Sequence, residues 1–196
     1  MKYRLHRTRK EWIVVGERVH YVGGNLRIAW EEAFLAYGLE GRQWGTVLLV
    51  GMGASLMQII AQTATPPLPQ VTVLEIDADM LALQQAHYTL PLTYFPHIGD
   101  AASTLPTLSQ KYDGIFVDAF QEDTIPASLL SSSFVEELHR HLSPTGLLFW
   151  NVLLSAEAKV VGELLRKAFT AVRQWRYPPH IFWAAAHDEV TFPLPF

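Results

Sequence analysis

The sequence contains no cysteine, and only 17% of its 196 residues are charged. Without thiols there is no disulfide, no thiol nucleophile and no cysteine-ligated metal. No apolar run approaches the roughly 18 residues that a membrane-spanning helix needs. The residues after Met1 are polar, unlike a secretion signal, so we expect a cytoplasmic protein. The net charge is −4 and basic residues cluster only over 2–10, so neither nucleic acid nor a membrane is an expected partner.

The eight histidines form no metal-binding pattern. His139 and His141 are two residues apart in a helical segment and do not share a face. His180 and His187 are seven apart in strand-like sequence, which places them on opposite faces. No HExxH motif is present, so we expect no metal. Ser55 lies outside a Gly-x-Ser-x-Gly elbow, and hydrolase chemistry therefore lacks its nucleophile signature.

The most informative stretch runs from Gly45 to Ile60. Thr46–Val50 is a short apolar run rich in β-branched residues, which is typical of a strand covered on both faces. Gly51 and Gly53 follow, and the residues from Ala54 onward have helical composition. A glycine turn between a strand and a helix brings backbone N–H groups and the positive helix end to one point, which suits a nucleotide.

The rest of the chain repeats this alternation of strands and helices, which predicts an α/β fold with a doubly wound, mostly parallel sheet of seven strands. We expect the last two strands to form an antiparallel edge. The predicted strands are 46–50, 71–75, 93–97, 114–117, 147–153, 174–177 and 180–186, and the predicted helices are 29–40, 54–63, 79–87, 102–108, 134–142 and 157–171.

The two ends of the chain differ from this pattern. Residues 1–28 are predicted to form a small β appendage, with strands over 12–16 and 18–22, a Gly-Gly-Asn turn over 23–25 and the start of a third strand over 26–28. Residues 29–196 then form the nucleotide-binding domain. Residues 190–196 are apolar and rich in proline, and we expect them to pack across the sheet edge.

Ligands of such sheets bind at the carboxyl ends of the strands. Glu75 lies 22 residues after Gly53, close to the roughly 20-residue offset of a carboxylate that accepts from a ribose diol. Asp100 is placed to accept from an adenine amino group, with the Ala101 N–H offered to a ring nitrogen. Asp118 ends an apolar strand where an acceptor must arrive, so it is the candidate catalytic residue. Asp77 joins this candidate cofactor-binding set.

Each of these carboxylates also has a purely structural interpretation. Glu75 or Asp100 would then cap the following helix, although Asp79 is better placed than Glu75 for a cap. Asp118 would anchor a loop. A dinucleotide dehydrogenase explains less of the pattern, because its fingerprint requires a third glycine where this chain has Leu56.

Four ordered motifs, spread over about residues 25–155, resemble the class I S-adenosylmethionine-dependent transferases, and more narrowly their spermidine synthase-like branch. They are Val50-Gly-Met-Gly-Ala-Ser-Leu56, Val73-Leu-Glu-Ile-Asp-Ala-Asp79, Ile98-Gly-Asp-Ala101 and Tyr112-Asp-Gly-Ile-Phe-Val-Asp-Ala-Phe120. The resemblance implies a class I methyltransferase-like Rossmann fold in which Glu75 holds the ribose, Asp100 the adenine, and Gly51 and Gly53 the donor's tail. It also implies that Asp118 helps to deprotonate an attacking amine.

Two departures concern the acceptor. Spermidine synthases carry a second aspartate after the strand-four aspartate, and Gln121 stands in its place here. Their Tyr-Gln-Glu motif corresponds to Trp30-Glu31-Glu32. We therefore take Trp30, Glu31, Phe120 and Gln121 as candidate substrate-binding residues, with solvated helix charges as the alternative interpretation of the two glutamates.

The sequence thus predicts transfer of a group from S-adenosylmethionine to a small-molecule acceptor such as an amine. Methyl transfer is favoured because the diamine-binding carboxylate is missing. Aminopropyl transfer from decarboxylated S-adenosylmethionine, as in polyamine biosynthesis, is the alternative. A non-catalytic nucleotide-binding module and a NAD-dependent enzyme are further alternatives, and the sequence leaves a homodimer open.

Overall fold

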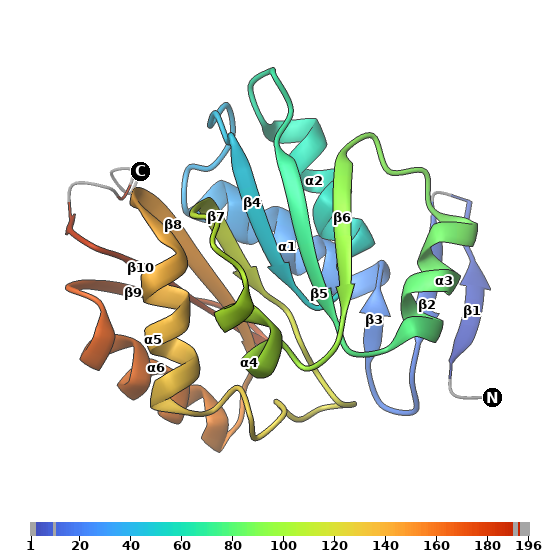
Figure 1. Cartoon of the computed structure of the whole chain (residues 1–196). Helices are drawn as coiled ribbons and strands as arrows, with labels where there is room; N and C mark the ends of the chain where they lie inside the picture. Colours follow the sequence, from blue (N-terminus) through green and yellow to red (C-terminus); the bar gives the residue numbers. More distant parts are fainter. Residues whose placement is uncertain (1–2, 10, 190–191, 193–196) are drawn as a thin grey trace.

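A computed structural model describes residues 3–9, 11–189 and 192 of the chain. Its centre is a seven-stranded sheet with the order β6-β5-β4-β7-β8-β10-β9 (Figure 1). All neighbouring pairs up to β8 are parallel, whereas β10 is antiparallel to both β8 and β9. The predicted sheet and its antiparallel edge are therefore confirmed. The strands are β4 (Thr46–Val50), β5 (Gln70–Glu75), β6 (Thr93–Ile98), β7 (Tyr112–Val117), β8 (Leu142–Leu153), β9 (Ala171–Tyr177) and β10 (His180–Ala186).

The strand order reverses at β4, which has β5 on one side and β7 on the other. This reversal creates a crevice at the carboxyl ends of the strands. The helices α1 (Gly24–Ala36), α2 (Ala54–Thr63) and α3 (Ala78–His87) contribute to the core on one face of the sheet. The other face is covered by α4 (Ala101–Thr104), a 3-10 turn (Leu105–Thr107), α5 (Ser132–His141) and α6 (Ala156–Ala168) (Figure 1).

Alternate residues of the central strand supply the two cores, as a strand buried on both faces requires. Val47 and Leu49 of β4 point into the core shared with α1 and α2, and Leu48 and Val50 point into the core shared with α5 and α6. All four side chains are at most 1% exposed. The run Thr46–Val50 therefore forms the predicted doubly covered strand.

A separate three-stranded antiparallel sheet precedes the main one. It consists of β1 (Arg4–Arg7), β2 (Trp12–Val15) and β3 (His20–Val22). Val14 and Val22 are buried in the same core as α1 and α2, so this sheet is joined to the main body by apolar packing. The division of the chain at residue 28 stays a prediction.

The predicted turn over 23–25 and the strand over 26–28 are wrong, because α1 already begins at Gly24. Gly23 has φ 77 and caps the helix without a side chain. Long-range partners replace a local cap: the Gly23 N–H donates to Ser55 Oγ at 2.9 Å and the Gly24 N–H to Glu11 Oε1 at 3.0 Å. The two glycines are typical of a turn, but here contacts with Ser55 and Glu11 satisfy their N–H groups and a helix begins instead.

Most of the remaining elements agree with the prediction, and 54–63 and 180–186 have the expected bounds. The strand β1 was not predicted, α6 ends three residues before the predicted bound of 171, and β9 begins three residues before the predicted 174. β8 begins five residues early, because Leu142 pairs with Tyr112 before the register shifts at the Pro144–Gly146 segment. Most of the apolar segment 190–196 lies outside the described residues; Phe192 is described and is 5% exposed. Within the part of the chain that the structure describes, no helix is long and apolar enough to cross a membrane.

Candidate active site

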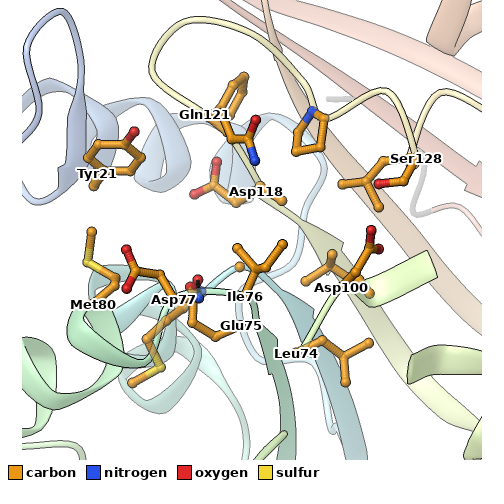
Figure 2. A pocket seen from close by; sticks show the side chains of 18 of the residues that line it. Tyr21, Leu74, Glu75, Ile76, Asp77, Met80, Asp100, Asp118, Gln121 and Ser128 are labelled. Atoms are coloured by element: carbon orange, nitrogen blue, oxygen red, sulfur yellow. Dashed lines mark hydrogen bonds between the residues drawn. The ribbon is translucent and has the colours of Figure 1, made fainter. Parts of the chain in front are cut away.

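A cavity of about 480 Å³ opens at the carboxyl ends of β4, β5, β6 and β7. Its volume is in the range of small-molecule sites, and it lies at the reversal of strand order where such sites are expected. Figure 2 shows Glu75 and Asp77 on one side of the opening and Asp118 and Gln121 on the opposite side. The predicted residues that line the cavity are Gly51, Glu75, Asp77, Asp100, Ala101, Asp118, Phe120 and Gln121.

Gly51 is required where the turn after β4 meets the turn after β7. Its φ is 95°, and a Cβ added there would lie 2.4 Å from the carbonyl oxygen of Asp118. No residue with a side chain fits this approach. Gly53 has an ordinary φ of −96° and caps α2. It is absent from the cavity wall, so the two glycines do not share one role.

Glu75 is held rigidly at the end of β5. Its Oε2 accepts from the Met52 N–H at 2.7 Å and its Oε1 from the Asp77 N–H at 2.8 Å. The side chain is 8% exposed, and this burial raises the pKa of the carboxyl, while the backbone donors oppose the shift. Each carboxylate oxygen has two acceptor positions, so this carboxylate can still accept from a ligand diol.

Asp77 caps α3, because its Oδ1 accepts from the Asp79 N–H at 3.0 Å. The expectation that Asp79 caps this helix is therefore wrong. The Tyr3 hydroxyl donates to Asp77 Oδ2. Tyr3 also lines the cavity, and sequence reasoning missed it. No local motif marks an N-terminal tyrosine that reaches the end of β5 only through the packing of the small sheet.

Asp100 follows β6 and starts α4. Its Oδ1 accepts from the Ala102 N–H at 2.7 Å, which is the helix cap considered from the sequence. Asp100 and Ala101 nevertheless line the cavity. A capping carboxylate keeps further acceptor positions, so capping and ligand binding are compatible at this residue.

Asp118 is held by two side-chain donors. Its Oδ2 accepts from the Trp30 Nε1–H at 2.8 Å and its Oδ1 from the Asn151 Nδ2–H at 2.9 Å. Burial raises the pKa of Asp118, and these two hydrogen bonds oppose the shift. Both donors fix the carboxylate in position. A half-buried carboxylate of raised pKa that lines a cavity is a suitable proton acceptor for a reacting amine or hydroxyl.

Of the predicted substrate-binding residues, Phe120 and Gln121 lie at the cavity and two others do not. Trp30 is 1% exposed and packs against Phe116 and Phe182, so it reaches the site only through its hydrogen bond to Asp118. Glu31 pairs with Arg27 at 2.8 Å and lines a different cavity near β2 and α2.

The small N-terminal sheet closes the site through Glu122. Its Oε2 accepts from the backbone N–H groups of Glu17 and Arg18, both at 3.0 Å, and its own N–H donates to the Tyr21 hydroxyl oxygen at 2.7 Å. Arg18 also pairs with Asp123 at 3.0 Å. These contacts hold the β2–β3 turn against the loop after β7, and Arg18, Tyr21 and Glu122 thereby become part of the wall.

A second cavity of about 300 Å³ adjoins the first. Arg18, Tyr21, Asp118 and Phe120 line both, so Asp118 stands at the junction. Sequence reasoning did not identify this cavity, because its walls come from segments far apart in the chain. Among the described residues, no three histidine, aspartate or glutamate side chains are arranged to hold a metal ion.

No protein-family model matches the chain. Among curated proteins, it is similar to a probable polyamine aminopropyl transferase of Bifidobacterium longum, with 27% identity over 128 residues. The match covers 65% of this chain and 28% of that protein, so the chain spans less than a third of its relative's length.

The structure is similar to that of a probable spermidine synthase from Corynebacterium glutamicum, with a TM-score of 0.76, 16% identity and coverage of 95% of this chain and 77% of the other. It is also similar to human methyltransferase-like protein 13 in complex with SAH, with a TM-score of 0.69, 18% identity and coverage of 84% and 85%. These similarities confirm the predicted class I methyltransferase-like fold.

Proposed function

We propose that the chain is an S-adenosylmethionine-dependent transferase that alkylates a small-molecule acceptor, with methyl transfer as its main reaction. The observation that carries this proposal is the convergence of Gly51, Glu75, Asp100 and Asp118 on one cavity at the reversal of strand order. Similarity to an aminopropyl transferase and to a methyltransferase in complex with SAH supports the same class of donor.

The donor fits this cavity residue by residue. Glu75 would accept from the ribose hydroxyls, because its carboxylate is fixed by two backbone donors and keeps acceptor positions. Asp100 and Ala101 would hold the adenine at the end of β6. Gly51 lines the cavity at the end of β4, where the donor's tail would lie. Asp77 supports the same wall through Tyr3 and α3.

Transfer is a displacement at the carbon attached to the sulfonium. The acceptor's lone pair forms the new bond to that carbon, and the carbon–sulfur bond breaks with its electron pair left on sulfur as a neutral thioether. The acceptor gives up one proton, and Asp118 is the group placed to receive it. The enzyme accelerates such a reaction mostly by holding the donor and the acceptor in the correct orientation, because no strong acid or base is needed to expel a thioether.

Aminopropyl transfer from decarboxylated S-adenosylmethionine is the second candidate, and the Bifidobacterium longum relative favours it. Against it stands Gln121, which lines the donor cavity where the related synthases carry a second aspartate. The two donors differ by one carboxylate in the tail, so binding and product analysis separate them.

The first experiment measures donor binding. Thermal shift and calorimetric titration with S-adenosylhomocysteine and with methylthioadenosine compare the thioether products of the two donors. We expect tighter binding of S-adenosylhomocysteine, and tighter binding of methylthioadenosine would favour aminopropyl transfer. NAD titration is run in parallel, and saturable NAD binding without a response to either thioether would contradict the proposal.

Substitution of Glu75 tests the site itself. Glu75→Gln keeps the shape but replaces one charged acceptor, so affinity for S-adenosylhomocysteine should fall about tenfold. The matched control is Glu163→Gln, which removes only an exposed pair with Lys159 on α6 and should leave the affinity unchanged. Mass spectrometry of amines incubated with each donor then detects turnover. Donor binding without any alkylated product would identify a non-catalytic nucleotide-binding module.

A further inference from the structure

The second cavity has a polar group that the donor site does not use. It is His180, at the start of β10 and 8% exposed. Leu153 on β8 is its partner in the sheet, and Asn151 is opposite Phe182, two residues along each strand. The register of β7, β8 and β10 thus brings His180 beside the carboxylate at the junction of the two cavities.

A chain of hydrogen bonds fixes the proton on the imidazole. Asn151 donates its Nδ2–H to Asp118, which places its Oδ1 toward His180 at 3.0 Å from Nδ1. An amide oxygen only accepts, so Nδ1 carries the hydrogen and Nε2 is left as an acceptor. His180 therefore donates to Asn151, and Asn151 donates to Asp118. Trp30 is the second donor to the Asp118 carboxylate.

Nε2 is available to a ligand. Among the described residues, this atom has no hydrogen-bond partner. It is also not one of the fully buried polar atoms without a partner, so it remains accessible from the cavity. Burial lowers the pKa of His180 to about 4. The ring is consequently neutral near pH 7 and presents a lone pair, not a positive charge.

The charges around the cavity limit what it can bind. Asp123 is paired with Arg18 at 3.0 Å. Asp118 has no cationic partner among the residues that the structure describes, and its two donors are neutral. One ammonium group therefore finds a countercharge at Asp118. A second ammonium at His180 would meet a neutral ring in a partly desolvated cavity, which is unfavourable.

We propose that His180 is a specificity-determining residue, whose Nε2 accepts a hydrogen bond from a neutral hydroxyl or amide group of an amine acceptor bound in the second cavity. This inference rests on the proposed function and defines its acceptor. The class is a small amine with one cationic centre, an apolar linker and a neutral hydrogen-bond donor at the far end. Leu26, Leu153 and Pro179 supply apolar surface for the linker.

Three amines of equal chain length test this selection by calorimetric titration, with and without saturating S-adenosylhomocysteine. The probes are 4-amino-1-butanol, 1,4-diaminobutane and n-butylamine. The unmodified protein should bind the amino alcohol about tenfold more tightly than either of the others, because only this probe satisfies both Asp118 and His180. Equal affinities, or a preference for the diamine, would overturn the inference.

Two substitutions assign the preference to His180. His180→Phe keeps a ring and removes the acceptor, so the amino alcohol should lose its advantage over n-butylamine. His180→Asp adds a carboxylate, so the order of amino alcohol and diamine should reverse. His97→Gln, on the exposed edge strand β6, is the control and should retain the original order. An unchanged order in both His180 variants would contradict the assignment.

Binding and turnover keep this inference separate from the proposed function. Selective amine binding that follows His180, without alkylated product from either donor, would support the inference and contradict the transferase proposal. Alkylation of diamines in preference to amino alcohols would support the transferase proposal and contradict the inference about His180. In the expected case, the unmodified protein alkylates the amino alcohol with the highest kcat/KM, and His180→Phe raises KM for it more than it lowers kcat.

Discussion

The two adjoining cavities are built in different ways. The larger one takes its polar groups from the ends of consecutive parallel strands, so Gly51, Glu75, Asp100 and Asp118 enter it in chain order. The smaller one combines the β2–β3 turn, the start of α1 and the start of β10. The first is a property of the parallel sheet, whereas the second depends on how distant segments pack over it.

This difference predicts that substitutions in the two cavities affect different properties of the protein. Changes at strand ends should alter donor binding, and changes in the covering segments should alter acceptor choice. Asp118 belongs to both walls, and it is therefore the residue at which the two effects must be separated by measurement.

The largest effect is expected from Gly51→Ala. The added Cβ would lie 2.4 Å from the Asp118 carbonyl oxygen at a φ of 95°, so the turns after β4 and β7 must move apart. We expect a loss of stability of about 3 kcal/mol or more and no measurable binding of S-adenosylhomocysteine. Urea denaturation and calorimetry measure the two quantities.

Gly41→Ala is the matched control for this substitution. Gly41 also has a positive φ, 74°, but a Cβ there would meet nothing within 4 Å. Only backbone strain of about 1–2 kcal/mol should remain, with donor affinity unchanged. Equal losses in the two variants would show that the close approach at Gly51 has no special role.

The next effect concerns Asp118→Asn, which keeps the shape of the shared wall and removes its charge. Turnover should fall by roughly a hundredfold or more if Asp118 receives the acceptor's proton. Donor affinity should change far less, because Glu75 and Asp100 remain. A parallel loss of donor affinity would instead assign Asp118 to the donor cavity.

The control, at the other end of the strand that Asp118 follows, is Asp113→Asn. Asp113 lies at the opposite end of β7, where it accepts from the backbone N–H groups of Gly45 and Thr46 and from the Ser143 hydroxyl. Its replacement should lower stability without a selective loss of turnover. The pair of variants thus separates a reacting carboxylate from a structural one.

The last expected effect appears only when the pH is changed, and it is a pH dependence of stability that distinguishes the two cavity walls. His180 has a pKa of about 4 when folded and 6.5 as its ordinary value, so between these values the unfolded state binds more protons. Stability should therefore fall as the pH drops from 6.5 toward 4, by up to roughly 3 kcal/mol from this group. Asp118 acts in the opposite direction, because its raised pKa makes stability fall as the pH rises above 3.8.

Comparison of the unmodified protein with His180→Phe over this pH range isolates the histidine. The variant loses the hydrogen bond to Asn151 at every pH, which shifts its stability by a constant amount. Only the slope of unfolding free energy against pH reports the titration. Equal slopes for the two proteins would show that His180 is not held neutral by burial.

Most of the sheet could be predicted from the sequence, because doubly buried strands are short apolar runs. Thr46–Val50 is such a run, and its two cores follow from simple alternation. The failures occurred where distant partners decide the local structure. Gly23 and Gly24 begin a helix because Ser55 and Glu11 satisfy their N–H groups.

The larger cavity was predictable for the same reason, since strand ends can be identified from sequence, and its role as the donor site stays a proposal. The smaller cavity was not predicted. Its key polar residue, His180, reaches Asp118 through Asn151, and this contact depends on the antiparallel register of β10 against β8. Gly53 shows the converse, because its place in a Gly-x-Gly motif predicted a ligand contact and the structure puts it outside the cavity wall.

The position of α1 has a consequence for the order in which the molecule forms. This helix is made early, yet its side chains pack against elements made late: Trp30 meets Phe182, and the Tyr37 hydroxyl, just after α1, donates to the Phe182 carbonyl at 3.0 Å. Contacts that span so much of the chain are slow to form. During synthesis, α1 can pack early against α2 and Phe116, but its apolar face is completed only when β10 emerges from the ribosome. Incompletely covered apolar surface of this kind favours aggregation of a nascent chain.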